Sequence, residues 1–198
     1  METKDLTYYQ RLNLRANAVM GLVMAATSPI VHVQMIQEVS VDFYKFIAFL
    51  NELLVLIIFF YLDKRDEDGS PKIIKKLRLY FFPIVVCGCI SFIAANFMGL
   101  IDVRVRFIII ASTEGIFGYL WKVSMEDLWN NLIHRTDLTA WINKIGKYDR
   151  LGAIVGATAI LFITPELEVA LGVQCLAYVY MGYCDYRIWK GTKDQAYA

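Results

Sequence analysis

The chain has 198 residues, of which 58% are hydrophobic and 14% aromatic, and its formal net charge is +1. Ordinary soluble domains are about 45 to 50% apolar, so this composition favours a membrane protein, and the near-neutral charge argues against nucleic-acid binding. We therefore expect an all-α, polytopic protein of the plasma membrane or the bacterial inner membrane, with the lipid bilayer as its first partner.

Apolar runs recur along the whole chain, and a helix needs about 20 mostly apolar residues to cross a bilayer. In chain order the predicted spans are about 16–36, 43–62, 79–98, 106–123, 147–164 and 169–188, so residues 1–198 form a single transmembrane domain. Pro29 should kink the first span, and the fifth must be extended by residues 147–150 to be long enough. The charged start of the chain carries no cleavage pattern of a signal peptide, so the first span should remain in place.

The positive charges predict the orientation of these spans. Most Lys and Arg residues lie near the N-terminus, in residues 63–78 and 135–150, and in the C-terminal tail. Lys and Arg accumulate in cytoplasmic loops, so both termini should be cytoplasmic. Two cytoplasmic segments, 72–78 and 124–146, are predicted to be amphipathic helices. A solvated loop is an alternative interpretation of the first. Trp129 and Trp141 in the second fit an aromatic belt at the membrane surface.

Two glutamates lie inside apolar spans that cross the membrane in the same direction. Glu52 and Glu114 should both lie near the bilayer centre, where an ionisable group costs about 2.5 to 3.5 kcal/mol on insertion scales. Such groups normally face the bundle interior, a wet cavity or a partner. With Asn51 beside Glu52, a pathway for a solute or a proton is one interpretation. The other is that each carboxyl is simply protonated or hydrogen-bonded to a neighbour.

The first span is unusually polar. Asn17 and His32 lie within it, and Pro29 frees a backbone carbonyl nearby. Both side chains are therefore further candidates for the pathway, while His32 also fits an interfacial residue near the outer boundary.

Small residues predict close helix packing, within the fold or between copies. Gly152 and Gly156 form a G-x-x-x-G pair in the fifth span, and Gly21 and Ala25 form a similar small pair in the first.

The sequence contains no motif that indicates a catalytic or metal-binding site. The four cysteines lie inside apolar runs without metal-ligand spacing, the chain has 2 histidines, and no common catalytic motif occurs. We expect no enzyme, no metal and no cofactor.

The order of these features resembles the N-terminal six-helix half of a major facilitator superfamily transporter. Residues 63–65, Gly69, Lys72 and residues 75–76 look like a loosened form of that family's loop between its second and third helices, with Phe59 where the first glycine is expected. Residues 135–157 look like its connection into a Gly-rich fifth helix. The resemblance implies that the first, second, fourth and fifth helices line a cavity, which places Glu52, Glu114 and Asn17 inward.

The family normally has two such halves with the substrate site between them, whereas this chain supplies one. The leading hypothesis is therefore a half-size transporter for a small solute, coupled to protons, that acts as a homodimer or with a partner half. The alternatives are a non-transporting membrane interaction or immunity-type protein, and a subunit of an oligomeric channel.

Overall fold

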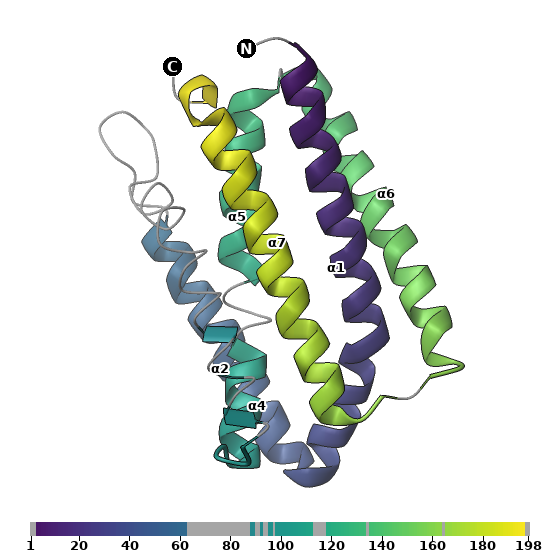
Figure 1. Ribbon diagram of the computed structural model, residues 1–198. Coiled ribbons are helices and arrows are strands. Elements are labelled where there is room, and N and C mark those ends of the chain that lie inside the picture. The colour runs from purple at the N-terminus through teal and green to yellow at the C-terminus, as the bar shows by residue number, and fades with distance from the viewer. Residues whose placement is uncertain are drawn as a thin grey trace.

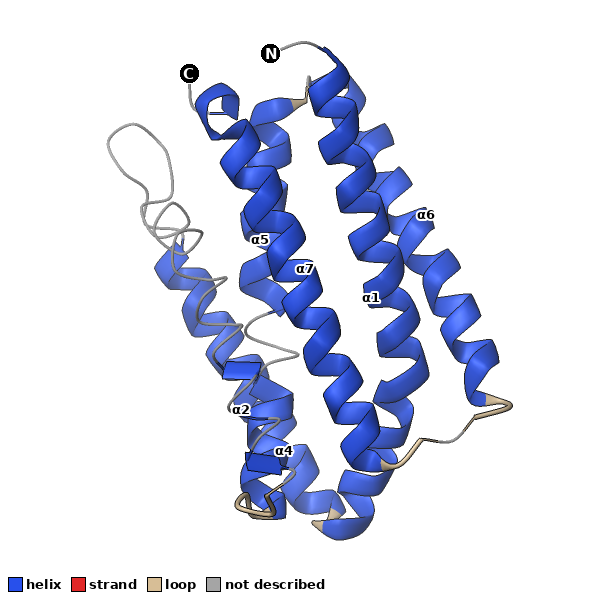
Figure 2. Ribbon diagram, in the orientation of Figure 1, coloured by secondary structure: helices blue, strands red, loops and turns tan. Residues whose placement is uncertain are grey.

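The computed structural model describes residues 3–62, 88–89, 92, 95–96, 98–112, 118–133, 135–163 and 165–196. All regular structure within these ranges is helical, and none of them contains a strand (Figure 2). The expected all-α class is therefore confirmed for the described chain. Segment 72–78 and most of the predicted span 79–98 lie outside these ranges, as does Glu114.

The first two helices are joined by a short turn at Ser40, and α2 then diverges from α1 (Figure 1). Helix α1 covers Thr3–Glu38, 36 residues, and α2 covers Val41–Leu62, 22 residues. The charged start of the chain is thus helical too, so α1 extends well beyond the predicted span 16–36. Ser40 caps α2, because its hydroxyl oxygen accepts a hydrogen bond of 3.3 Å from the backbone N–H of Phe43.

The next described helices are α4, Val103–Ser112, and α5, Gly118–Leu132. A turn precedes α4, and Gly99 adopts a φ of 65° there, a conformation that glycine reaches without strain. Asp102 caps α4 by accepting a hydrogen bond of 2.8 Å from the backbone N–H of Arg104. The predicted span 106–123 covers the end of α4 and the start of α5, with residues 113–117 outside the described ranges.

Helix α6 covers Arg135–Ile160 and α7 covers Leu167–Ala196. The predicted amphipathic segment 124–146 is therefore divided between α5 and α6. Helix α6 ends at Ile160, and residues 161–163 form a turn rather than completing the predicted span 147–164. Pro165 prevents the helix from continuing through this turn, because in a helix its ring would clash with the carbonyl of Leu161, four residues earlier.

Three long helices form the centre of the fold. Helices α1 and α6 run in the same direction side by side, and α7 packs against α1 in the opposite direction (Figure 1). The two chain termini lie at the same end of the bundle, while α2 and α4 lie together on one side. The end of the bundle that holds the two termini is the one that the charge distribution predicts to be cytoplasmic.

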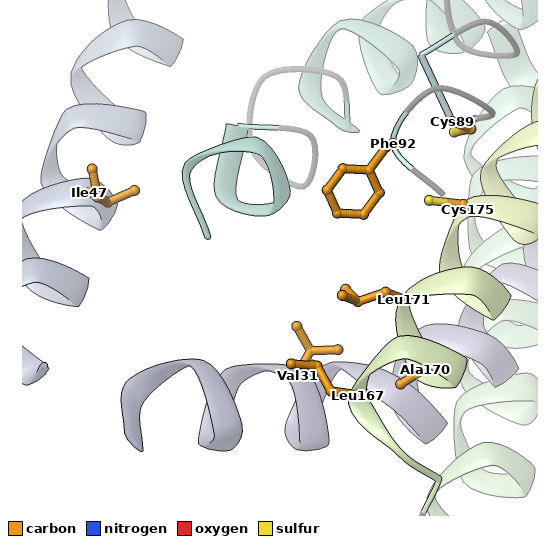
Figure 3. Packing of buried hydrophobic residues seen from close by; sticks show 8 residues of the cluster. All are labelled: Val31, Ile47, Cys89, Phe92, Leu167, Ala170, Leu171 and Cys175. Atoms are coloured by element: carbon orange, nitrogen blue, oxygen red, sulfur yellow. The ribbon is translucent and has the colours of Figure 1, made fainter. Parts of the chain in front are cut away.

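Two apolar clusters hold the ends of the bundle. At the end far from the termini, α1, α2 and α7 meet the short described segments around Cys89 and Phe92, and the Cys89 and Cys175 side chains approach each other (Figure 3). At the other end, Trp129 and Trp141 pack with ring centroids 4.9 Å apart and are 2% and 6% exposed. The expected aromatic belt is therefore wrong for these two residues, because their rings fill the junction of α5 and α6 with the bundle.

The exposed faces of the three central helices change character along their length. Toward the end with the termini they carry cations, and further along they carry exposed apolar side chains. The cations are Arg11 and Arg15 on α1, Lys147 and Arg150 on α6, and Arg187 and Lys190 on α7. The apolar side chains beyond them are Val19 and Leu22 on α1, Leu151, Ile154 and Val155 on α6, and Leu176, Val173 and Val169 on α7. From Val169 to Tyr183, the exposed face of α7 extends about 21 Å, about two thirds of the ~30 Å of a bilayer's hydrocarbon core.

Among the described helices, two are long and apolar enough to cross a membrane, judged by length and composition alone: α1 over Leu6–Glu38 and α7 over Leu167–Thr192.

Candidate functional site

A polar layer lies inside the bundle between α1 and α7. The Gln174 amide donates a hydrogen bond of 3.2 Å to the Ser28 hydroxyl, and the neighbouring Thr27 hydroxyl donates to the Val23 carbonyl at 2.7 Å. Gln174 and Thr27 are buried. Gln174 was not among the predicted site residues, although an amide inside the apolar span 169–188 is a signal that sequence analysis could have used.

Three side-chain amide oxygens are buried and receive no hydrogen bond within the described part of the chain. They are the amide oxygens of Gln34 on α1, Asn51 on α2 and Asn96 in the segment between α2 and α4. A buried acceptor without a donor costs about 1 to 3 kcal/mol.

Glu52 lies at mid-length on the exposed face of α2. Its neighbours on that face are large and apolar, Phe49 at 65% exposure and Leu56 at 51%. Ser28 and Glu52 are each about 12 residues from the turn at Ser40, so along their helices both lie about 18 Å from it. Within one copy, Glu52 is thus at the height of the Ser28–Gln174 layer but on the outside of the bundle.

Asn17 and His32 occupy separate places on α1. The half-buried Asn17 amide donates hydrogen bonds to the Asn13 backbone carbonyl at 2.9 Å and to the Asn13 side-chain oxygen at 3.3 Å. His32 lies near the other end, where its ring meets the Tyr44 ring of α2 edge to face at a centroid distance of 6.1 Å. The described candidates therefore form no single cluster within one copy.

The glycine pairs lie where α1 and α6 cross. A Cβ atom on Gly152 would collide with the backbone carbonyl of Ala18, and one on Gly156 with that of Leu22. Gly21 on α1 is held equally closely by the backbone carbonyl of Asp149, and Ala25 one turn later is half-buried. These contacts are within one copy and bring the two backbones together.

An ion pair joins α4 to α7 at the end far from the termini. The Arg106 guanidinium lies 3.7 Å from the Glu168 carboxylate, with side chains 13% and 42% exposed. The nearer acid in sequence, Asp102, instead caps α4. Within the described residues no group of three His, Cys, Asp or Glu side chains could hold a metal ion.

Comparisons with models of protein families, with curated proteins and with solved structures found no match.

Proposed function

We propose that this chain is a multi-pass membrane protein that works as a half-size transporter for a small solute. Two features of the described fold support a bilayer setting. The exposed face of α7 is apolar or aromatic from Val169 to Tyr183, over about 21 Å, whereas buried polar side chains such as Thr27, Asn96 and Gln174 lie inside. A soluble protein is expected to carry its polar side chains mainly outside.

The observation that carries the proposal is Glu52 on the exposed apolar face of α2. A carboxylate facing lipid at mid-bilayer costs about 2.5 to 3.5 kcal/mol on insertion scales. That cost is avoided when a second protein surface covers the residue, and most homo-oligomers use two-fold symmetry. A second copy against α2, related by an axis along the membrane normal, would place the two Glu52 side chains opposite each other.

Two facing carboxyl groups favour sharing one proton, because like charges at short distance cannot both be ionised without a large penalty. In the proposed dimer this pair takes up and releases the proton that is coupled to solute movement. Asn51 precedes Glu52 in the sequence, but its side-chain oxygen is buried within the copy. Glu114 remains a second candidate from the sequence.

Uptake into proteoliposomes tests this proposal. A panel of labelled sugars, amino acids and organic cations is offered with an inward proton gradient, and we expect at least one solute to accumulate. Glu52→Gln should abolish gradient-driven accumulation while leaving the protein folded. Asp42→Asn changes an exposed acid in the first turn of the same helix and should retain it. An unchanged dependence on the gradient in both Glu52→Gln and Glu114→Gln would remove the mechanism.

The exposure of Glu52 also supports the channel alternative, in which several copies arrange α2 around a pore. Electrical recording in planar bilayers separates the two: a channel gives unitary currents that Glu52→Gln alters, and its particles hold more than two copies. A monomer in native lipid without uptake or current would instead favour the interaction protein.

A further inference from the structure

The exposed face of α7 follows a chemical order that matches a lipid molecule lying along it. Side chains at three- or four-residue steps share one face of a helix. On this face Val169, Val173 and Leu176 are followed by Tyr180 and Tyr183 and then by Arg187 and Lys190. Hydrocarbon contacts therefore come first, then aromatic rings, then cations.

Tyrosine rings hold two of the cations in place at the surface. The Arg187 guanidinium donates a hydrogen bond of 2.9 Å to the Tyr183 hydroxyl and lies 5.8 Å from the centroid of that ring. Lys190 lies over the Tyr186 ring at 5.9 Å. Neither contact neutralises the positive charge, and the guanidinium keeps further N–H donors for an anion.

Helix α1 adds cations beside this face. Tyr8, Arg11 and Arg15 are exposed on one side of α1, and this part of α1 packs against α7 in clusters that join Leu14 with Ile188 and Ala16 with Cys184. Within the described side chains, no ion pair joins a carboxylate to Arg11, Arg15, Arg187 or Lys190. A cationic patch shared by two helices is thus left without an anion from the described chain.

We propose that Arg15, Arg187 and Lys190 bind the phosphate headgroup of an anionic phospholipid, whose acyl chains lie along Val19, Leu22 and Leu176. An arginine pairs well with phosphate because its planar donors match the oxygens. Tyrosine favours the boundary between headgroups and hydrocarbon. A free phosphate ion would use the cations but not the apolar face beneath them. The inference rests on the membrane setting of the proposed function and not on transport.

Lipid binding to the purified protein tests this site. Phosphatidylglycerol and phosphatidylcholine adducts are quantified by native mass spectrometry after release from nanodiscs of defined composition. At about 1 kcal/mol per cation near the surface, each lost arginine should weaken phosphatidylglycerol binding about fivefold, and the double variant Arg15→Gln/Arg187→Gln about 30-fold.

The matched control is Lys45→Gln/Arg104→Gln, which removes two exposed cations from α2 and α4 and should leave the preference for phosphatidylglycerol unchanged. Inorganic phosphate at millimolar concentration should not displace the lipid. Equal binding to wild type and the Arg15/Arg187 variant would overturn the proposal, as would displacement by inorganic phosphate. Solute uptake is not the readout, so loss of this site and loss of transport are told apart.

Discussion

Helices α6 and α2 are both long and both leave apolar side chains exposed, yet they meet α1 in opposite ways. At the α6 contact, Gly152 and Gly156 let the two backbones touch. Helix α2 carries no glycine, and Ile47 is the one buried residue among its described side chains. How closely each helix approaches α1 therefore depends on its small residues and not on how hydrophobic it is.

This contrast has a physical reason in a bilayer. Lipid chains are as apolar as leucine, so burying a large apolar side chain between helices gains little there. Close backbone approach gains dispersion contacts that lipid cannot match. Helix α6 is therefore held within the copy, while the wide face of α2 around Glu52 remains available to lipid or to a second chain.

Cysteine cross-linking tests most directly whether the exposed face of α2, and not that of α6, contacts a second copy. In a background with the native cysteines replaced by alanine, Phe49→Cys places a thiol on the exposed face of α2, and Ile154→Cys places one on the exposed face of α6. After oxidation with copper phenanthroline in membranes, we expect most of the Phe49→Cys protein to run as a dimer and little of the Ile154→Cys protein. Equal cross-linking of both would refute α2 as the specific contact.

A methyl group at the α1–α6 contact should have the next largest effect. Gly152→Ala forces a Cβ against the backbone of Ala18, and overpacking of this kind costs about 1 to 3 kcal/mol. Gly146→Ala is the matched control on the same helix, because nothing lies within 4 Å of its added Cβ. It should instead stabilise the helix by about 0.5 to 1 kcal/mol.

Unfolding in mixed micelles, followed by tryptophan fluorescence, measures both changes. Opposite signs for the two glycines are the expected pattern. If Gly152→Ala is as stable as the control, the helices must be able to separate at this point without loss.

Local sequence patterns predicted the helices better than their partners. The apolar runs correspond to described helices in α1, α2, α6 and α7, because run length and periodicity are local properties. The spacing of Gly152 and Gly156 indicated close packing but left open whether the neighbour was the same chain or another. The structure places Ala18 and Leu22 of α1 there, which spacing along α6 cannot encode.

The candidate site shows the same limit more sharply. The depth of Glu52 follows from counting residues along one helix, but the side on which it lies depends on how α2 packs. The Ser28–Gln174 hydrogen bond joins residues 146 positions apart, so no local pattern reveals it. Likewise, Trp129 and Trp141 suit a membrane surface by residue type, but they are buried because they pack against each other and against Leu14 and Ile188 of other helices.

The ion pair between α4 and α7 joins the side of the molecule with α2 and α4 to the central helices, and we expect its loss to have a small effect. Glu168→Gln removes the carboxylate that faces the Arg106 guanidinium at 3.7 Å, and because Glu168 is partly exposed we expect a loss of about 1 kcal/mol in unfolding free energy. Glu166→Gln changes an exposed acid two residues earlier and should stay within about 0.5 kcal/mol of wild type. Raising the salt concentration should reduce the difference between the two variants, since exposed charge pairs are screened. If the two variants are equally stable at low salt, the Arg106–Glu168 ion pair contributes nothing measurable to stability. Apolar contacts alone then hold α4 against α7.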